Sequence, residues 1–266
     1  EIIAATITPL PSAATIAPMP TVSRELLQRL REFDTALIAN TVNAIDGTPP
    51  HEWYMGGSIQ SVTPSLGPTV GVAYICELDS STPGGEAALA DAWRLLAAQA
   101  PAERPSVLVV KTVGSRPDHE CVLGDGMAKC LYAAGCLGVV TDGGVRDVAG
   151  LMTVPFAAYA KGKTIHHGLL RFRHVPVLEE IGGITVRQGD VIHADGGGVI
   201  TIPAACLSAL PERAVQMQSL ERDAHSLFRR TDVSLSEKRR GVQRLLERYG
   251  FRNAVDVEIP SSVERA

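Results

Sequence analysis

The segment GDGMAKCLYAAGCLGVVTDGGVRDV, residues 124–148, decides the fold. Its apolar spacing predicts a helix over 125–134 that stops at Gly135, a residue common just after a helix end. The run LGVVTD, 137–142, predicts a buried strand, and Gly143-Gly144 predicts a tight turn before a short helix. A ten-residue helix rises about 15 Å and a six-residue strand returns about 20 Å. We therefore expect the start of the helix and the end of the strand to meet at one edge of the sheet.

The flanking sequence supplies further elements on both sides of this unit. Residue spacing predicts helices over 23–33, 35–45, 86–100, 203–230 and 236–250, two strands within 58–78, one strand over 106–113 and short strands between 155 and 203. These elements do not follow a regular βαβ repeat. The pattern therefore favours an α+β layered sandwich with C-terminal helices over a Rossmann sheet.

Composition weakens the case for two classes of partner. The 266 residues carry 25 basic and 29 acidic side chains, for a formal charge of −4, and the basic residues are scattered, so we expect no nucleic-acid partner. No window approaches the roughly 18 apolar residues of a membrane span, so we expect no membrane association.

Five cysteines without a CxxC pair and the lack of a secretory signal predict a cytoplasmic location. The Ala, Thr and Pro bias of residues 1–21 predicts an extended arm.

Asp125, Arg146 and Asp147 are the charged side chains that the helix and strand would bring together. Glycines beside them leave room for a ligand, and the first amides of the helix at 125 suit a carboxylate. Two carboxylates with water in the remaining positions suit Mg²⁺ or Mn²⁺ better than zinc, for which we find no His or Cys cluster. Composition and spacing by themselves favour a plainer interpretation, in which Arg146 and Asp147 form a surface ion pair and Asp125 is a helix N-cap.

The same segment resembles the signature of the family that contains regulator of ribonuclease activity A and the 4-hydroxy-4-methyl-2-oxoglutarate aldolases. Aldolases of this family are marked by an Asp, twenty intervening residues and then Arg-Asp, and residues 126–145 form that gap here. A second segment, GGITVRQGDVIHADGGGVITIP, resembles the family's other signature. The resemblance implies a catalytic domain over 22–230, preceded by the arm of 1–21 and followed by a C-terminal helical extension over 231–266.

The resemblance also implies an assembly and a set of roles. The fold would be a swivelling β/β/α-type sandwich, assembled as a trimer or hexamer with its sites in clefts between subunits. Asp147 would ligate the metal directly, Asp125 would hold a metal-bound water, and Arg146 would bind the pyruvyl oxygens. The substrate carboxylate would be received by the backbone amides of Gly126, Met127 and Ala128.

A carboxylate from the C-terminal helix of a neighbouring subunit is a further implication of the resemblance. The segment SLERDAHSLFRR offers Asp223 or Glu221 for this role. The two lie about 200° apart around a helix, so only one of them could face a neighbouring cleft. A solvated helix face is the competing interpretation.

Together these features predict a divalent-metal-dependent lyase of the class II pyruvate aldolase type. It would cleave a 4-hydroxy-2-oxo acid to pyruvate, and the same enolate would allow it to decarboxylate oxaloacetate. The alternative is a catalytically silent trimer that binds and inhibits a partner protein such as a ribonuclease. Such regulators typically lack the Asp at the position of Asp147, so its presence favours the enzyme.

Other polar residues carry plainer expectations. We expect His166 and His167 to be an exposed loop pair, with a pocket-lining role as the alternative. We expect structural roles for the remaining candidates, which are His193 as a hydrogen-bonded residue, Cys121 and Cys130 as packing residues, and Asp190 and Asp195 as turn residues.

Overall fold

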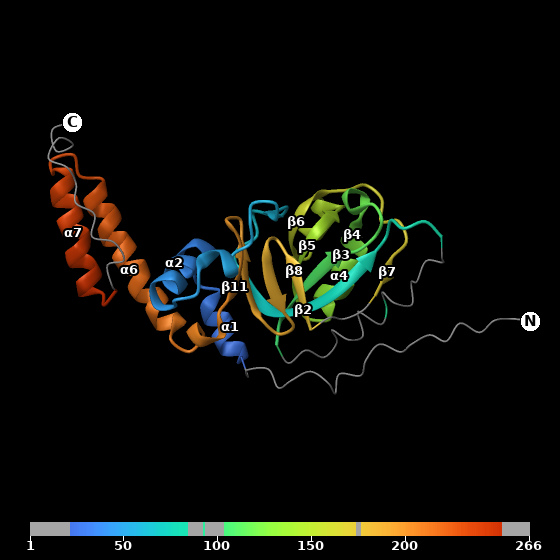
Figure 1. Ribbon diagram of the computed structural model, residues 1–266, viewed down its shortest axis with the longest axis horizontal. Coiled ribbons are helices and arrows are strands. Elements are labelled where there is room, and N and C mark those ends of the chain that lie inside the picture. The colour runs from blue at the N-terminus through green and yellow to red at the C-terminus, as the bar shows by residue number, and fades with distance from the viewer. Residues whose placement is uncertain (1–21, 85–92, 94–103, 174–176, 252–266) are drawn as a thin grey trace, which may run out of the picture.

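The computed structural model describes residues 22–84, Trp93, 104–173 and 177–251. The predicted arm of residues 1–21 lies outside these ranges, as does the predicted helix over 86–100 apart from Trp93. Within the described residues, a mixed sheet has helices against one face and at one end, and a pair of C-terminal helices projects beyond that end (Figure 1).

The helices begin and end close to where the sequence predicts. They are α1 (Arg24–Leu30), α2 (Thr35–Ile45), α4 (Asp125–Ala133), α5 (Val148–Leu151), α6 (Leu210–Phe228) and α7 (Leu235–Arg248), with single turns of 3-10 helix at η2 (Pro50–Glu52), η3 (Pro117–His119) and η4 (Ala204–Cys206). Caps explain several of the starts. The side chains of Ser23 and Asp34 accept hydrogen bonds from the first turns of α1 and α2. The predicted helix over 203–230 starts later, at Leu210, because the chain first makes the short turn η4.

Nine strands of the described residues join one mixed sheet. They are β1 (Gln60–Ser61), β2 (Thr69–Asp79), β3 (Ser106–Thr112), β4 (Cys121–Leu123), β5 (Cys136–Val145), β6 (Ala157–Lys163), β7 (Arg171–Phe172), β10 (Val191–Asp195) and β11 (Gly198–Ile202). The main path runs β1-β6-β5-β3-β2-β10-β11, with parallel pairing from β6 to β2 and antiparallel pairing at both ends. A separate hairpin joins β8 (Leu178–Ile181) to β9 (Ile184–Arg187).

The predicted turn at Gly143-Gly144 is wrong, because β5 continues through both glycines to Val145. A Cβ on Gly143 would lie 2.6 Å from Cγ2 of Thr112, and one on Gly144 would lie 2.6 Å from Cγ2 of Thr164. The glycines therefore serve close packing of neighbouring side chains, with a register shift in the β5–β6 ladder, and they do not reverse the chain.

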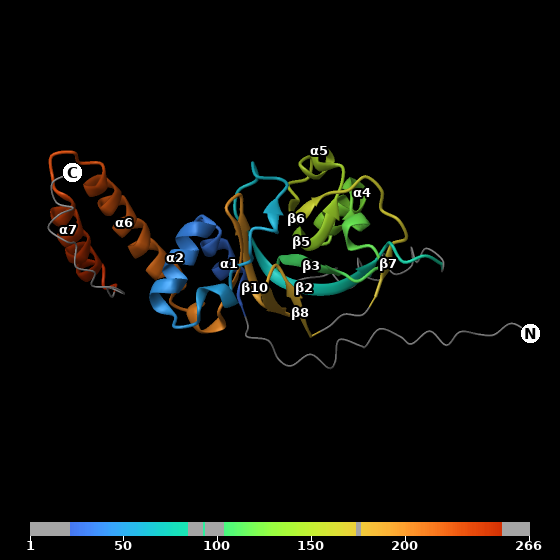
Figure 2. The same cartoon turned by 45° about the horizontal axis from the view of Figure 1, so that its top comes forward.

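Three apolar clusters fill the spaces between the layers. Figure 2 shows the helices that border them, with α4 and α5 on one side of the sheet and α1 and α2 beside β10 at its end. One lies between the central sheet and helices α4 and α5, where Leu131 and Leu151 meet Val139. A second fills the opposite face beneath the β8–β9 hairpin. The third joins α1, α2 and α6 to the β10–β11 end of the sheet. The layered α+β arrangement expected from the sequence is therefore confirmed.

The third cluster contains one polar connection. His193 of β10 is fully buried, with Nδ1 2.9 Å from Oγ1 of Thr35 and Nε2 3.1 Å from the carbonyl oxygen of Leu30. A proton on Nε2 would let the ring donate to Leu30 and accept from Thr35, so the neutral ring satisfies both partners. The structural role expected for His193 is confirmed.

Helices α6 and α7 lie side by side and extend away from the sheet (Figure 1). Ser234 and Glu237 form a reciprocal capping box at the start of α7, and Phe251, just after it, packs into the third cluster. The division of the chain at residues 22 and 231 stays a prediction. None of the helices in the described part of the chain is long and apolar enough to span a bilayer.

Candidate functional site

The candidate site lies where β4 and β5 end. These two strands run parallel, α4 begins at Asp125 directly after β4, and Arg146 and Asp147 directly follow β5. A Cβ added to Gly124 would lie 2.5 Å from Oδ2 of Asp147 and 2.9 Å from Nε of Arg146. The start of the helix and the end of the strand therefore converge, as the lengths of the two elements predict.

Arg146 and Asp147 form an ion pair, with Nε 3.1 Å from Oδ2. The side chains are 32% and 44% exposed, so both can reach a ligand. Although it lies near that carboxylate, the Nε of Arg146 is buried and has no hydrogen-bond partner among the residues that the structure describes. A buried donor without a partner is costly, so this nitrogen is suited to an oxygen atom of a ligand.

Asp147 has an unusual backbone. Its φ of 55° and ψ of 39° place it in the left-handed region, at the N-cap position of α5. Its side chain makes no capping hydrogen bond to that helix. The carboxylate is therefore directed by the backbone toward Arg146 and Gly124 and does not serve the helix.

Asp125 is the first residue of α4, and the N-cap is Gly124, so the interpretation of Asp125 as an N-cap is wrong. Its Oδ2 lies 2.6 Å from Nζ of Lys129, one turn further along the helix. The hydrogen bond and charge of Lys129, with smaller contributions that include Arg146, hold the pKa of Asp125 below its usual range. Lys129 was not among the predicted site residues, although the spacing of four residues in DGMAK signals the pair.

A glycine also explains how α5 approaches Asp125. A Cβ on Gly150 would lie 2.5 Å from Cβ of Asp125 and 2.8 Å from its Oδ2. A larger residue at position 150 would push either the helix or the carboxylate away. Gly124 and Gly150 thus keep open the space around the two carboxylates.

The predicted carboxylate-binding amides lie in the first turn of α4. The amide of Ala128 donates to the carbonyl oxygen of Gly124 at 3.1 Å, so a ligand there would compete with the first hydrogen bond of the helix. Gly126 and Met127 precede that bond, in the part of the turn where helical amides lack partners within the helix. Binding of a substrate carboxylate to these amides stays a prediction.

The donor chemistry fits a hard divalent cation held by few protein ligands. The described residues contain no group of three or more His, Cys, Asp and Glu side chains arranged around a common point. Asp125 and Asp147 are oxygen ligands, and Gly124 leaves room beside Asp147 where a Cβ would stand. Mg²⁺ and Mn²⁺ accept one or two carboxylates and keep water in their other positions.

Glu120 supports this edge of the sheet, and it is not among the residues that the sequence analysis singled out. It is fully buried and accepts hydrogen bonds from the amides of Ser80, Ser81 and Gly114 and from the Ser81 hydroxyl. Its carbonyl oxygen accepts from the amide of Gly144 in β5. Glu120 therefore ties the loops after β2 and β3, through its carboxylate, to the strand that precedes Arg146, through its backbone carbonyl. The local sequence carries no spacing signal for such a long-range role.

The cysteines and histidines near the site differ in how deeply they are buried. Cys121 is fully buried, and burial raises the pKa of its thiol, as expected for a packing residue. Cys130 is exposed on α4, so its predicted packing role is wrong, because its position faces away from the apolar side of the helix. His166 and His167 stack with ring centres 5.0 Å apart in the loop after β6, and His166 is exposed while His167 is half-buried.

Glu221 and Asp223 both engage neighbours within their own chain. Glu221 accepts a hydrogen bond from Nδ2 of Asn40 at 2.8 Å, and Asp223 accepts one from the Tyr249 hydroxyl at 2.7 Å. Both lie on α6, which projects from the end of the molecule opposite to α4 and α5 (Figure 2). Within a single chain, neither carboxylate belongs to the candidate site.

The model of the RraA-like family, described as Aldolase/RraA, matches residues 41–201, which is more than half of the chain and includes β4, β5, β10 and all but the last residue of β11.

Curated relatives match over shorter stretches. A putative 4-hydroxy-4-methyl-2-oxoglutarate aldolase of Halalkalibacterium halodurans is 32% identical over 95 residues, which cover 35% of this chain and 44% of the relative. An uncharacterized protein of Methanocaldococcus jannaschii is 30% identical over 116 residues, 43% of this chain and 56% of the relative. The chain thus spans about half the length of these relatives.

Solved structures share the fold. A protein from Pseudomonas syringae pv. tomato superposes with a TM-score of 0.60 at 23% identity, covering 82% of this chain and 98% of the other. Streptomyces coelicolor RraAS2, described as an unusual member of the RNase ES inhibitor RraA protein family, gives a TM-score of 0.60 at 21% identity over 77% of this chain and 98% of its own. At these identities the likeness concerns the fold alone.

Proposed function

Because the chain belongs to the RraA-like family, we propose that it is a divalent-metal-dependent lyase that cleaves a 4-hydroxy-2-oxo acid to pyruvate and decarboxylates oxaloacetate. The proposal rests on one observation. The Arg146–Asp147 pair that follows β5 lies next to Gly124 and Asp125 at the start of α4. The relative described as a putative aldolase supports the same reaction class. The family also contains ribonuclease inhibitors, so membership by itself does not choose between catalysis and binding.

Asp147 and Asp125 would hold Mg²⁺ or Mn²⁺, Asp147 directly and Asp125 through water. When bound, such a cation supplies Lewis-acid polarisation of the 2-oxo acid. The negative charges of the two carboxylates are balanced by Lys129 and Arg146, which reduces the repulsion between them.

Arg146 would bind the oxygens of the pyruvyl group and stabilise the enolate as negative charge develops. Its planar guanidinium suits two oxygens at once, and its Nε has no hydrogen-bond partner among the described residues, although Oδ2 of Asp147 lies 3.1 Å away. Asp125, whose pKa is held low by Lys129, would accept the proton of the C4 hydroxyl through an intervening water as the C3–C4 bond breaks. The electron pair of that bond would become the enolate, and water would return a proton to C3 to give pyruvate. The amides of Gly126 and Met127 would receive the substrate carboxylate.

The test is pyruvate release by protein stripped with a chelator and then supplied with Mg²⁺ or Mn²⁺. Asp147→Asn should lower turnover of 4-hydroxy-2-oxo acids and of oxaloacetate by at least about a hundredfold, because a neutral amide weakens a hard-cation site. Asp118→Asn, at an exposed acid paired with Lys161, is the matched control and should retain activity. If the wild type with metal releases no pyruvate from any of these acids, the non-catalytic branch of the family becomes the better assignment.

We also propose that the chain forms a trimer or hexamer, with each site completed at a subunit cleft. This follows from the family resemblance and from the small number of ligands that one chain offers around Asp125 and Asp147. Light scattering coupled to size exclusion gives the mass directly, and a monomeric enzyme with full activity would contradict the proposal.

A further inference from the structure

Two buried side-chain atoms near the ends of β5 and β6 have no hydrogen-bond partner. They are Nε of Arg146 and Oγ1 of Thr164, and within the described part of the chain the only other such atom is Oγ of Ser80. A buried polar atom without a partner is costly to the folded state, so two of them at one place need a physical reason. A ligand that supplies an oxygen atom to both would be such a reason.

The register of the sheet sets Thr164 beside Arg146. The last parallel pair of β5 and β6 joins Val145 to Lys163. Arg146 and Thr164 directly follow these two residues. The amide of Thr164 donates to the carbonyl oxygen of Val145 at 3.1 Å, which continues the pairing by one more bond. The two residues therefore lie side by side where the strands end.

Gly144 makes room for the side chain of Thr164. A Cβ on Gly144 would lie 2.6 Å from both Oγ1 and Cγ2 of Thr164. The threonine side chain therefore occupies the space that a side chain at position 144 would fill. Alternate residues of a strand project to the same face, so Arg146 projects to the face of β5 on which Thr164 lies. The two unpartnered atoms thus share one face at the end of this strand.

Cys121 approaches Gly144 from the other neighbouring strand, because the two residues pair in the β4–β5 register. Burial raises the pKa of the Cys121 thiol, and the Thr164 hydroxyl and the charge of Arg146 oppose that rise, so both groups lie near the sulfur. A thiol is only a weak hydrogen-bond partner, and Sγ of Cys121 is directed at the carbonyl oxygen of Leu123, at 3.7 Å. The cysteine therefore does not satisfy the hydroxyl.

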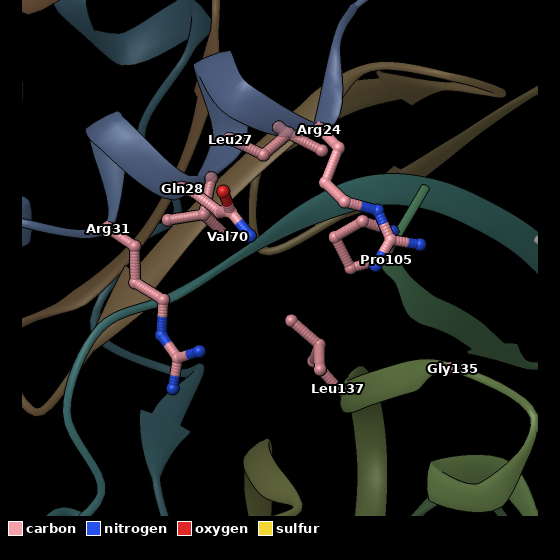
Figure 3. Close-up of a pocket in the computed structure, with 8 residues that line it drawn as sticks. All are labelled: Arg24, Leu27, Gln28, Arg31, Val70, Pro105, Gly135 and Leu137. Atoms are coloured by element: carbon pink, nitrogen blue, oxygen red, sulfur yellow. The ribbon is translucent and has the colours of Figure 1, made fainter. Parts of the chain in front are cut away.

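Space for a small ligand adjoins the threonine. Gly144, Gly162 and Thr164 line a cavity of about 160 Å³, which equals about five water volumes of roughly 30 Å³ each. The cavity drawn in Figure 3, of about 240 Å³, is a different one beside α1. It borders Leu137 near the beginning of β5, about 23 Å along the strand from Gly144. The two unpartnered atoms therefore belong to the edge of the sheet that carries the candidate site.

We propose that the Thr164 hydroxyl donates a hydrogen bond to the 2-oxo oxygen of the substrate and acts beside Arg146 as a second donor to that oxygen. The inference rests on the proposed lyase function. There the substrate carboxylate is assigned to amides at the start of α4, which leaves the 2-oxo oxygen for donors at the end of β5. This oxygen gains negative charge as the C3–C4 bond breaks, so a fixed donor binds the enolate more strongly than the ketone.

Thr164→Val removes the hydroxyl and keeps the shape of the side chain. We expect kcat for oxaloacetate decarboxylation by the full-length protein with Mg²⁺ to fall about ten- to a hundredfold, with little change in KM, because the lost bond is strongest to the enolate. Thr164→Ser keeps a hydroxyl and should retain most of the wild-type kcat. Thr185→Val, at a half-buried threonine of the separate β8–β9 hairpin, is the matched control and should leave both constants unchanged.

Two further measurements do not depend on turnover. Oxalate is a planar analogue of the pyruvate enolate, and calorimetric titration should show that it binds Thr164→Val about tenfold more weakly than the wild type, whereas pyruvate loses less than about threefold. Without ligand, Thr164→Val should raise the midpoint of thermal unfolding by about 2–4 °C, because valine removes a buried hydroxyl that has no partner. A threonine with a purely structural role would give a lower midpoint.

The outcomes separate this inference from the proposed function. If the wild type releases pyruvate and Thr164→Val matches it in kcat and in oxalate affinity, the hydroxyl does not contact the ligand, and the lyase function stands. A lower unfolding midpoint with equal losses of pyruvate and oxalate binding would assign Thr164 to packing alone. If the wild type releases no pyruvate, the lyase function fails, and a selective loss of oxalate binding in Thr164→Val would still support the contact. Absence of oxalate binding to such an inactive wild type would overturn both.

Discussion

Nζ of Lys129 lies 2.6 Å from Oδ2 of Asp125. One of the two carboxylates proposed to bind a divalent cation is therefore already paired with the ammonium group of a lysine. The two cations would compete for the same oxygens, and their charges would repel each other. Lys129→Met should therefore bind Mn²⁺ about two- to fivefold more tightly than the wild type. Electron paramagnetic resonance of free Mn²⁺ measures this affinity without any need for turnover.

The conservative control for this prediction is Lys129→Arg, which keeps the charge and should leave the affinity near that of the wild type. Weaker Mn²⁺ binding in Lys129→Met would mean that the ammonium orients Asp125 toward the metal and does not compete with it.

Arg146→Lys should lose most of the activity, with a fall in kcat/KM of about a hundredfold, while Mn²⁺ binding is retained. A lysine keeps the positive charge but loses the planar pair of donors for a carboxylate and an enolate. Steady-state kinetics on oxaloacetate give the comparison. Kinetics like those of the wild type would reduce Arg146 to a surface partner of Asp147.

His193 predicts how stability depends on pH. Its burial lowers the pKa of the ring below the ordinary 6.5, against opposing contributions from the carbonyl of Leu30 and nearby acids. The unfolded chain therefore takes up a proton in a range where the folded chain does not, and the free energy of unfolding should fall as pH drops below about 6.5. Above that pH both states hold a neutral ring and this contribution is constant.

Urea unfolding between pH 7.5 and 5 measures the effect, with His193→Gln as the comparison. The variant should be less stable at pH 7.5 but should lose less free energy on acidification. Parallel pH profiles for the two proteins would show that another group dominates the slope.

The question of a carboxylate from a neighbouring subunit can be decided by mixing inactive protomers. Asp147→Asn combined with a variant at the true trans position should regenerate some intact sites and hence some activity. Glu221→Ala and Asp223→Ala should be tested separately, because Asp223 is held by Tyr249 and Glu221 by Asn40. If both single variants keep full activity on their own, neither Glu221 nor Asp223 serves a neighbouring site.

Local signals predicted the individual elements well. The helix predicted over 35–45 is present as α2, where the structure adds Asp34 as its N-cap, and α4 ends before Gly135, whose φ of 89° suits glycine. The convergence of Asp125 with Arg146 followed from the lengths of one helix and one strand, because both lie within 25 residues of sequence.

Long-range features escaped the same reasoning. The sequence pattern suggested no parallel sheet, because the pairing of β2 with β3 and β5 depends on which strands become neighbours after folding. The glycines at 143 and 144 carry a turn signal, yet packing against Thr112 and Thr164 explains them. The role of Glu120 likewise depends on two loops, at residues 80–81 and 114, that meet only in the folded chain.

The left-handed backbone of Asp147 restricts which experiments can isolate its side chain. Of the residues with a side chain, Asn and Asp enter this region most readily, whereas other substitutions add a conformational penalty of about 1 kcal/mol or more. Asp147→Asn therefore changes charge and leaves the peptide geometry undisturbed, but Asp147→Ala or Asp147→Glu would perturb the entry into α5 as well. An alanine scan would overstate the chemical contribution of this position, and a selection experiment would return few viable alternatives even if the carboxylate had no catalytic purpose.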